Sequence, residues 1–496
     1  MILLVALRNL LHRPGRSLFL LLGYGLGVGV MIVLLAIGQA LLSQARDETL
    51  VGGGEITVLP EGLNVEVMKT GGVGGLYFSI DNARFIYRQL LAAPRLAGDV
   101  RAAAPQMVQK LVYVRAKGRD IPVRATGEIP SLSERVGAVP RLAAGAWRDD
   151  DGDRRWIDPT PYELYSEVDH FHLTPAGVSS PDSWGEWHYF NVLSADHRRW
   201  AFISYIVAGD VRGSRWGGQV AVTLRDQGGR TRRFAMRAPA ARVRFSTTTP
   251  DLAIGGARVT LLPDGRYRLR GSAREEGGSA RLTLDLVVTP APGALFPGAQ
   301  LASGAFTSGY AVPALRAAAT GAICVDGRCE RFDGAQAYHD HNWGVWRGVR
   351  WEWGATRAGS YTLLYGRVEP PDSTMSRPPL FVYLVDSLGF RALFRPRRID
   401  YVDARTITVN GRPVRVPARF TFADARGDDT LRVAVTVEDA IGTDTRGPLI
   451  ERGDAGAARL LREPYFIQMK GRATIAGRVL GAPVAGAGEG FFETYR

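Results

Sequence analysis

Three short apolar runs follow one another near the middle of the chain: WHYFNVL at residues 187–193, RWAFISYIVAG at 199–209 and GQVAVTLRD at 218–226. Each is rich in β-branched and aromatic residues and bounded by turn-forming residues, a pattern typical of antiparallel strands. Runs of the same kind continue toward the C-terminus, including ARVTLLPDGRYRLRG (257–271), ARLTLDLVV (280–288), YTLLYGRV (361–368), LFVYLVD (380–386), DTLRVAVTVED (429–439) and FIQMKGRATIAG (466–477). The sequence therefore predicts a mainly β body of antiparallel barrels or sandwiches.

Length and composition set the scale of this body. The 496 residues exceed one domain of about 100 to 200 residues. Hydrophobic residues make up 46% and charged residues 22% of the chain, as in globular proteins. Roughly 300 residues of β pattern exceed one eight-stranded barrel, so we divide the body into domains at 166–311 and 312–496.

The net charge of +13 comes from arginine, because four of the 62 basic residues are lysines (Lys69, Lys110, Lys117 and Lys470). The arginines are spread along most of the chain, and no aromatic-basic motif accompanies them. We therefore expect no nucleic-acid partner, and at most a weak attraction to anionic membrane surfaces.

An uncharged segment near the N-terminus predicts one transmembrane helix at residues 17–43. Its apolar part of about 25 residues is long enough to cross a bilayer core. Arginines precede it and acidic residues follow it, so the positive-inside bias leaves residues 1–16 in the cytoplasm and the rest in the periplasm, anchored to the inner membrane. The alternative is a cleaved signal peptide with a small-x-small site at Gly38-Gln39-Ala40, but its apolar region would be unusually long.

The two cysteines agree with an oxidising compartment. In GAICVDGRCERF, Asp326-Gly327 is a two-residue hairpin signal that places Cys324 opposite Cys329. Cross-strand neighbours at that separation meet disulfide geometry. Two free buried thiols are the alternative.

Residues 46–145 mix helix and strand signals, which predicts a small α+β module. The expected elements are a strand at 55–59, a helix at 81–91, and strands at 111–115 and 121–125 around a Lys117-Gly118-Arg119 turn. With ALRNLLHRPGRS before the apolar segment and PVRATGEIPSL after the second strand, this part resembles the start of ABC permeases of the macrolide-exporter and lipoprotein-release (MacB/FtsX) type. The resemblance implies a periplasmic module and ABC transporter subunits as partners. The chain has no P-loop motif to power transport itself, and charged, proline-bearing residues 146–165 predict a linker.

The segment Tyr338-His339-Asp340-His341-Asn342-Trp343-Gly344 is dense in chemically active side chains. If it is a strand, alternation sends Tyr338, Asp340 and Asn342 to one face and His339, His341 and Trp343 to the other. One of the two sets would line a barrel interior.

Here the sequence resembles the lipocalin-like family of carotenoid hydratase (hydroxyneurosporene synthase, CrtC) and the AttH proteins. The matching pieces are GEWHYFN at 185–191, GYAVPALRAAATGAICVDGRC at 309–329, YHDHNWG at 338–344 and GEGFFETYR at 488–496. The resemblance implies two lipocalin-like β-barrel domains, the second carrying YHDHNWG. The hydratases have a Tyr-x-Asp-x-Asn-x-Gly pattern, which matches Tyr338, Asp340, Asn342 and Gly344.

That resemblance implies that Asp340, with Tyr338 beside it, protonates an isoprenoid double bond. His341 and Trp343 are closer to the Asp-His-Glu-Trp-Gly form of the AttH branch. A buried carboxyl keeps its proton near neutral pH, and aromatic faces stabilise a carbocation. We expect the ligand to contact these residues: Glu186, Trp187, Tyr189, His341, Asn342, Trp343 and Trp351. The competing interpretation is that Asp340 accepts hydrogen bonds from a turn or from Arg347 while the tryptophans fill a seam.

Two further interpretations concern polar residues. Glu186 is either a second cavity acid or, as we favour, a strand-end charge bonded to arginine. His170-x-His172 and His339-x-His341 each place two imidazoles on one strand face, where Asp169, Asp340 or His188 could complete a metal site. Nothing in the sequence brings the two pairs together, so we expect hydrogen-bonded histidines, no metal and no cofactor.

The sequence thus predicts a membrane-anchored protein that binds an apolar lipid or isoprenoid and works with an ABC transporter. The alternative is an acid-catalysed hydratase or cyclase that uses Asp340 as proton donor. A third hypothesis makes the barrels a protein-docking platform.

Overall fold

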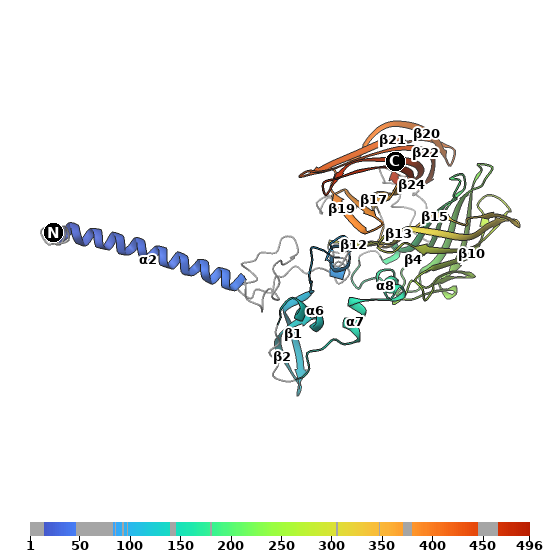
Figure 1. The fold of residues 1–496 in the computed structure, drawn as a ribbon. Helices are drawn as coiled ribbons and strands as arrows, with labels where there is room; N and C mark the ends of the chain where they lie inside the picture. The colour runs from blue at the N-terminus through green and yellow to red at the C-terminus, as the bar shows by residue number, and fades with distance from the viewer. Residues whose placement is uncertain are drawn as a thin grey trace. The chain divides into compact units, whose positions relative to one another are not determined.

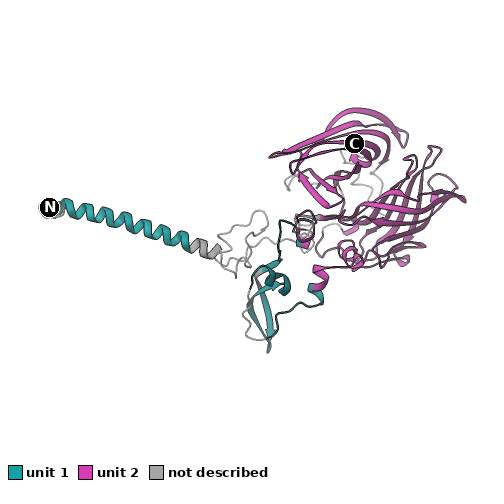
Figure 2. Ribbon diagram, viewed as in Figure 1, with its two compact units in different colours: residues 1–83, 97–153 teal, residues 84–96, 154–496 magenta. Residues whose placement is uncertain are grey.

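The computed structural model describes these parts of the chain: 14–45, 83–84, 86–91, 94–96, 98–138, 145–178, 181–303, 306–346, 348–370, 379–444 and 465–496. They fall into two compact units, residues 1–83 with 97–153, and residues 84–96 with 154–496 (Figure 2). The first unit holds the apolar helix and a small hairpin, and the second holds the β body.

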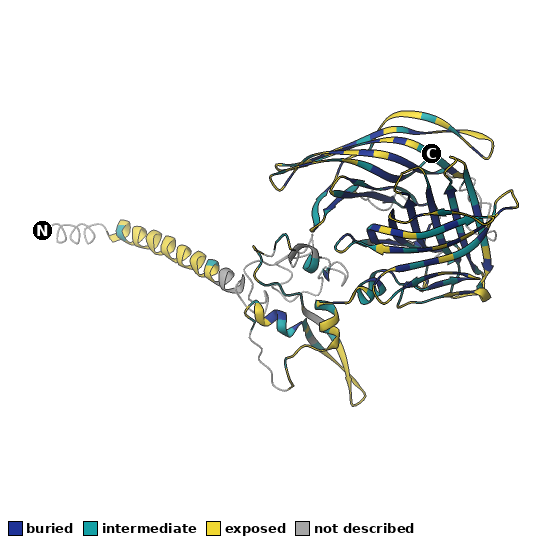
Figure 3. Ribbon diagram, turned by 45° about the vertical axis from the view of Figure 1, so that its right-hand side comes forward, coloured by how far each residue is buried: buried dark blue, intermediate teal, exposed yellow. Residues whose placement is uncertain are grey.

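Helix α2 (Pro14–Ala45) includes the predicted transmembrane segment and is uninterrupted. Within it, Pro14–Gln39 is long and apolar enough to cross a membrane. Its described side chains are exposed along most of the helix (Figure 3). Leucines, valines and isoleucines that face outward all round a helix are typical of a segment whose surroundings are lipid.

A hairpin and a short helix make up the rest of the first unit that the structure describes. Strands β1 (Gln106–Ala116) and β2 (Arg119–Glu128) pair antiparallel, with Ala116 opposite Arg119. Lys117 and Gly118 both have positive φ, 49° and 74°, as a tight turn with left-handed residues requires. The predicted turn is therefore confirmed. Helix α6 (Pro130–Arg135) follows, and the strand expected at 55–59 lies outside the described residues.

Short helical elements occupy the residues where the sequence predicted a helix (81–91) and a linker (146–165). The helix expected at 81–91 contains one π-helical segment, η1 (Ile86–Leu91). The expected linker at 146–165 instead contains helices α7 (Asp151–Ile157) and α8 (Pro161–Val168). Helix α8 begins here because Thr160 and Glu163 form a capping box, and Pro161 occupies a first-turn position that needs no N–H donor. The boundary between the two compact units, at residues 153–154, lies within the range of the predicted linker.

The first sheet of the β body closes into a barrel (Figure 1). Strand β10 pairs with β6 through its C-terminal end and with β11 along its length, which joins the two ends of the strand order. The resulting ring is β3-β4-β5-β6-β10-β11-β13-β15, and β15 pairs back onto β3. Eight antiparallel strands in chain order form an up-and-down barrel, the lipocalin-like arrangement.

The strands of the ring are β3 (Trp184–Leu193), β4 (Trp200–Gly209), β5 (Trp216–Arg225), β6 (Thr231–Pro239), β10 (Tyr267–Glu275), β11 (Arg281–Pro290), β13 (Phe306–Val325) and β15 (Ala335–Val345). Shorter strands extend the sheet from β10 and β13, namely β7 (Val243–Phe245), β8 (Leu252–Ile254), β9 (Ala257–Leu261), β12 (Phe296–Ser303) and β14 (Arg328–Arg331). Two 3-10 turns, η2 (Pro181–Ser183) and η3 (Ala240–Arg242), complete this part.

The second sheet has nine antiparallel strands in the order β19-β18-β17-β16-β24-β23-β22-β21-β20. Its strands are β16 (Arg350–Ala358), β17 (Tyr361–Glu369), β18 (Phe381–Asp386), β19 (Gly389–Phe394), β20 (Asp400–Val409), β21 (Arg412–Arg426), β22 (Asp429–Asp444), β23 (Tyr465–Val479) and β24 (Ala482–Tyr495). Side chains from both ends of this order share one buried core, so the sheet is rolled. Within the described residues, no ladder joins its edge strands β19 and β20.

The division between the two sheets differs from the predicted boundary near residue 312. Strand β13 crosses that position, and β15 returns to the first barrel, so the change of sheet lies between Val345 and Arg350. YHDHNWG therefore belongs to the first barrel. The full length of β13 was not predicted because Pro313 interrupts its strand pattern. The pairing of β13 with β15 shifts register between Ala311 and Ala314, next to this proline. A proline is tolerated in a strand at such a bulge.

The hydrophobic core has three parts. One fills the first barrel and one fills the rolled second sheet. The third lies between the two sheets, where Tyr189 and Phe202 of the first sheet share a cluster with Trp353, Leu364 and Phe491 of the second. This third core, called the intersheet core below, contains Tyr338.

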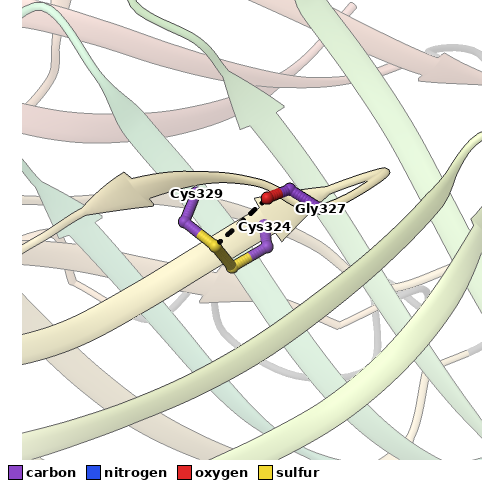
Figure 4. Close-up of a disulfide and its surroundings, with 3 residues drawn as sticks. All are labelled: Cys324, Gly327 and Cys329. Carbon is purple, nitrogen blue, oxygen red and sulfur yellow. Dashed lines mark hydrogen bonds between the residues drawn. A yellow bond between two sulfur atoms is a disulfide. The ribbon is translucent and has the colours of Figure 1, made fainter.

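The hairpin formed by β13 and β14 carries the disulfide between Cys324 and Cys329 (Figure 4). The two residues are directly opposite in the ladder, as the sequence predicted. Asp326 and Gly327 have positive φ, 50° and 81°, which is the conformation that the Asp-Gly turn signal predicts.

Candidate functional site

Strand β15 divides the YHDHNWG side chains between two environments. Tyr338, Asp340 and Asn342 are the ladder partners of Asn191, Tyr189 and Trp187, and Tyr338 and Tyr189 belong to the intersheet core. His339 and His341 face the other way. His339 stacks on Phe190 of the barrel core at 4.0 Å between ring centroids. The predicted alternation is confirmed, and the histidine face is the one that lines the barrel interior.

Asp340 is buried, with 4% of its surface exposed, and both carboxyl oxygens accept hydrogen bonds. The Tyr338 hydroxyl donates to Oδ2 at 2.8 Å, and the Asn342 amide donates to Oδ1 at 2.7 Å. Trp353 Nε1 donates to the Tyr338 oxygen at 2.8 Å, which fixes the phenol. Burial, followed by the nearby negative charge of Glu493, raises the pKa of Asp340 well above its usual range.

Glu493 on β24 is a second carboxyl at this site, and the sequence analysis did not single it out. Trp351 Nε1 donates to Oε2 at 2.8 Å, and Gln468 Nε2 donates to Oε1 at 3.3 Å. Burial raises its pKa from 4.5 to about 7. The available signal was an isolated acid after the apolar pair of Phe491 and Phe492 in GEGFFETYR.

Aromatic rings form one wall of the site. Trp187 lies 4.7 Å from Trp346 and 6.3 Å from Trp351 between ring centroids, and Trp351 lies 5.0 Å from Tyr495. Trp187, Trp351, Asn342 and Glu493 are only partly buried. This side of the site is therefore partly open to solvent.

A small cavity of about 30 Å³ lies on another side of Tyr338. Its lining includes Asn191, Arg357 and Glu489 as well as apolar side chains. This volume is room for one or two water molecules, and polar lining groups are what such waters need.

A second polar cluster occupies the barrel interior, on the opposite face of β3 and β15. His341 Nε2 lies 3.0 Å from Glu186 Oε1, and His172 Nδ1 lies 2.8 Å from the same oxygen. Glu186 therefore contacts histidines instead of the arginine that we favoured. The indole of Trp343 stacks on His172 at 4.1 Å.

The structure thus separates the predicted site residues into two groups. Around Asp340 it gathers a first group: Tyr338, Asn342, Trp187, Tyr189 and Trp351. Glu186, His341 and Trp343 lie together in the barrel interior with Asp169, which the sequence could not place beside them. The reason is the pleat, because neighbouring residues of one strand point to opposite faces. Asp340 is not bonded to a turn, and Arg347 lies outside the described residues.

The β body belongs to the class of eight-stranded up-and-down barrels, here joined to a rolled nine-stranded sheet. The buried carboxyl of Asp340 and the partly buried carboxyl of Glu493 come from the first and second sheets, respectively. No protein-family model matches the chain, and no curated protein does either.

Several solved structures are similar to it. An AttH-like protein of Nitrosomonas europaea has a TM-score of 0.45 and 17% identity, over 66% of this chain and 100% of the other. Kievitone hydratase of Nectria haematococca has a TM-score of 0.40 and 15% identity, over 66% and 95%. The protein CghA, solved with Sch210972, has a TM-score of 0.39 and 14% identity, over 68% and 96%.

Proposed function

We propose that this protein is an acid catalyst that protonates a carbon–carbon double bond of an apolar, isoprenoid-like substrate, with Asp340 as the proton donor. The observation that carries the proposal is the buried carboxyl of Asp340, which Tyr338 and Asn342 hold beside the charge of Glu493 and near partly buried tryptophans. A carboxyl that keeps its proton at neutral pH is the acid such a step requires. The raised pKa values of both groups support this role.

The step balances in atoms and charge. The Asp340 O–H bond breaks, its proton forms a C–H bond at one alkene carbon, and a carbocation develops at the other. The faces of Trp187 and Trp351 offer electron density to that cation. Water adds to the cation and releases a proton that restores the acid, so the net reaction is addition of water. Capture by a second double bond of the substrate, followed by proton loss, would give a cyclic isomer.

Tyr338 orients the acid in this scheme. Its hydroxyl holds Asp340 Oδ2 and is itself held by Trp353. Asn342 holds the other oxygen, so the carboxyl cannot rotate freely while the substrate is bound. A fixed donor avoids the reorganisation that a mobile acid would need at each turnover.

The proposal is tested by deuterium transfer. The full chain in detergent is incubated in D₂O with a panel of acyclic isoprenoid alkenes, and the recovered lipids are analysed by mass spectrometry for carbon-bound deuterium. We expect incorporation by the wild type and loss of at least about 100-fold in Asp340→Asn, the range that general acids contribute. Asp403→Asn, which changes a surface carboxyl paired with Arg419, serves as the matched control. Equal incorporation by Asp340→Asn would contradict the assignment.

Apolar ligand binding without chemistry is the second candidate, favoured by the partly exposed tryptophan wall. A wild type that retains a lipid but never exchanges deuterium into it would support this candidate. Anchoring by α2 would present either activity to membrane lipids, with the β body in the periplasm. Partnership with an ABC transporter rests on the sequence resemblance of residues 1–145 and stays a prediction.

A further inference from the structure

Three polar side chains from three separate elements converge inside the first barrel. Asp169 follows α8, His188 lies on β3 and His339 lies on β15, and each has 0% of its surface exposed. Asp169 Oδ2 lies 2.9 Å from His339 Nε2, and Asp169 Oδ1 lies 3.4 Å from His188 Nδ1. All three of these donor positions lie within 4.8 Å of one another.

The ring nitrogens of His188 and His339 that point away from Asp169 determine the tautomer of each imidazole. His188 Nε2 lies 2.9 Å from the Pro250 carbonyl oxygen, and His339 Nδ1 lies 3.0 Å from the Tyr189 carbonyl oxygen. Because a carbonyl only accepts, these nitrogens carry the hydrogens. In a neutral imidazole the other nitrogen is then an acceptor. A backbone carbonyl behind each ring is the usual support of a metal-binding histidine.

The arrangement leaves a buried polar atom that the protein itself does not satisfy. His188 Nδ1 has no hydrogen-bond partner among the residues that the structure describes. It faces a carboxylate, which also only accepts, so the two lone pairs repel each other unless a proton or a metal ion lies between them. A metal ion held by Asp169, His188 and His339 would supply that positive charge to all three groups at once.

The neighbouring set of His172, Glu186 and His341 is satisfied without an ion. Both oxygens of Glu186 accept from the His172 backbone N–H, at 2.9 and 3.0 Å. His341 connects the two sets, because its Nδ1 lies 2.7 Å from Asp169 Oδ1 and its Nε2 contacts Glu186. Donation from His341 would orient the Asp169 carboxylate, as hydrogen bonds to ligating carboxylates do.

We propose that Asp169, His188 and His339 bind one divalent first-row transition-metal ion inside the first barrel. Two imidazoles and one carboxylate suit zinc, iron or cobalt, whereas calcium and magnesium prefer oxygen donors. The ion ties the segment after α8 to strands β3 and β15. This inference is independent of the proposed chemistry at Asp340.

The test measures metal directly. The full chain is purified in detergent without a metal-chelating tag, and its metal content is determined by plasma mass spectrometry. Chelator-stripped protein is then titrated with Co²⁺ and followed by visible absorption. We expect about one ion per chain and the ligand-field bands of a nitrogen–oxygen site. His188→Gln and His339→Gln should each weaken Co²⁺ binding by about 100-fold or more.

His170→Gln is the matched control, because that histidine contacts the Glu167 carbonyl oxygen and lies outside the three-residue set. It should bind Co²⁺ as the wild type does. Co²⁺ binding that is unchanged in both variants would mean an adventitious ion and overturn the proposal. If the variants do not fold, the wild type decides. A melting temperature that neither chelator lowers nor Zn²⁺ restores, with no Co²⁺ spectrum, would also overturn it.

Discussion

At the scale of single residues, the charge of Glu493 acts on Asp340 although more than 150 residues separate the two in the sequence. Each has a raised pKa, and burial is the first cause for both. The charge of Glu493 adds to the shift at Asp340, since two nearby carboxylates cannot both ionise cheaply. Protons held by this pair are therefore linked to folding as well as to chemistry.

We expect Glu493→Gln to stabilise the protein more at pH 8 than at pH 5. The folded-state pKa of Glu493 is raised from 4.5 to about 7, so between these values the folded state binds more protons than the unfolded state. The free energy of unfolding then falls as pH rises through this window. Glutamine cannot ionise, so the variant does not lose this stability as the pH rises. Thermal unfolding of wild type and variant at pH 5 and pH 8 measures the difference.

Asp403→Asn controls for the general effect of removing a carboxylate. The groups that act on Glu493 are Trp351, Gln468, Tyr189 and Asp340, and none of them is altered in either variant. An equal change in melting temperature at pH 5 and pH 8 for Glu493→Gln would show that Glu493 titrates normally.

The part of the candidate site that lies on β15 could be predicted from the local sequence. Alternation along 338–344 is a local property, so the sequence assigned Tyr338, Asp340 and Asn342 to one face correctly. Glu493 reaches the site through the pairing of β24 with β16, which no local pattern encodes. The prediction that Glu186 pairs with an arginine was wrong for the same reason, because its actual partners, His172 and His341, lie on other segments of the chain.

At the scale of elements, the short helices and the long strand β13 depart most from expectation. Charged and proline-bearing residues suggested a linker at 146–165, and the length of the β pattern suggested a domain boundary near 312. Pro161 instead begins α8, and Pro313 lies at a register shift within β13. Proline disrupts a pattern of hydrogen bonds only where its missing N–H is needed.

The disulfide hairpin gives a prediction at this scale. Replacing both Cys324 and Cys329 by serine should lower the free energy of unfolding by about 2 kcal/mol, the loop-entropy value for a very short closed loop. Denaturant unfolding of the variant beside the oxidised wild type measures the loss. Reduced wild type should match the variant. If oxidised wild type and variant unfold at the same denaturant concentration, the Asp326-Gly327 turn alone holds the hairpin.

At the scale of the whole molecule, the mainly β class was predictable from recurring strand patterns, and a lipocalin-like barrel from the family resemblance. The location of the candidate site was not. The first barrel is filled by its own core and by the segment that follows α8, with Asp169 and Phe171 fully buried. The candidate site at Asp340 lies instead beside the intersheet core, an arrangement that depends on tertiary packing.

Membrane attachment is the prediction that belongs to the whole chain. The full-length protein should remain with membranes after a high-salt wash, because Pro14–Gln39 is apolar enough to span. A variant without residues 1–45 should move to the soluble fraction. Protease added to spheroplasts should digest the β body if it faces the periplasm. An intact mass that shows cleavage after Ala40 would replace the anchor with a signal peptide.

The alternation of β3 and β15 has a consequence for how the protein can be altered. Two groups of residues with different chemistry alternate along the same short strands. The Asp340 group takes even positions on β15 and odd positions on β3, and the histidine group takes the others. A substitution changes a residue of one group and leaves the other group in place. An insertion or deletion of one residue would exchange their faces, burying Asp340 among the barrel's aliphatic side chains and turning His339 toward the tryptophans. Engineering of this protein must therefore preserve the number of residues in β3 and β15, because that number sets which face each side chain points to.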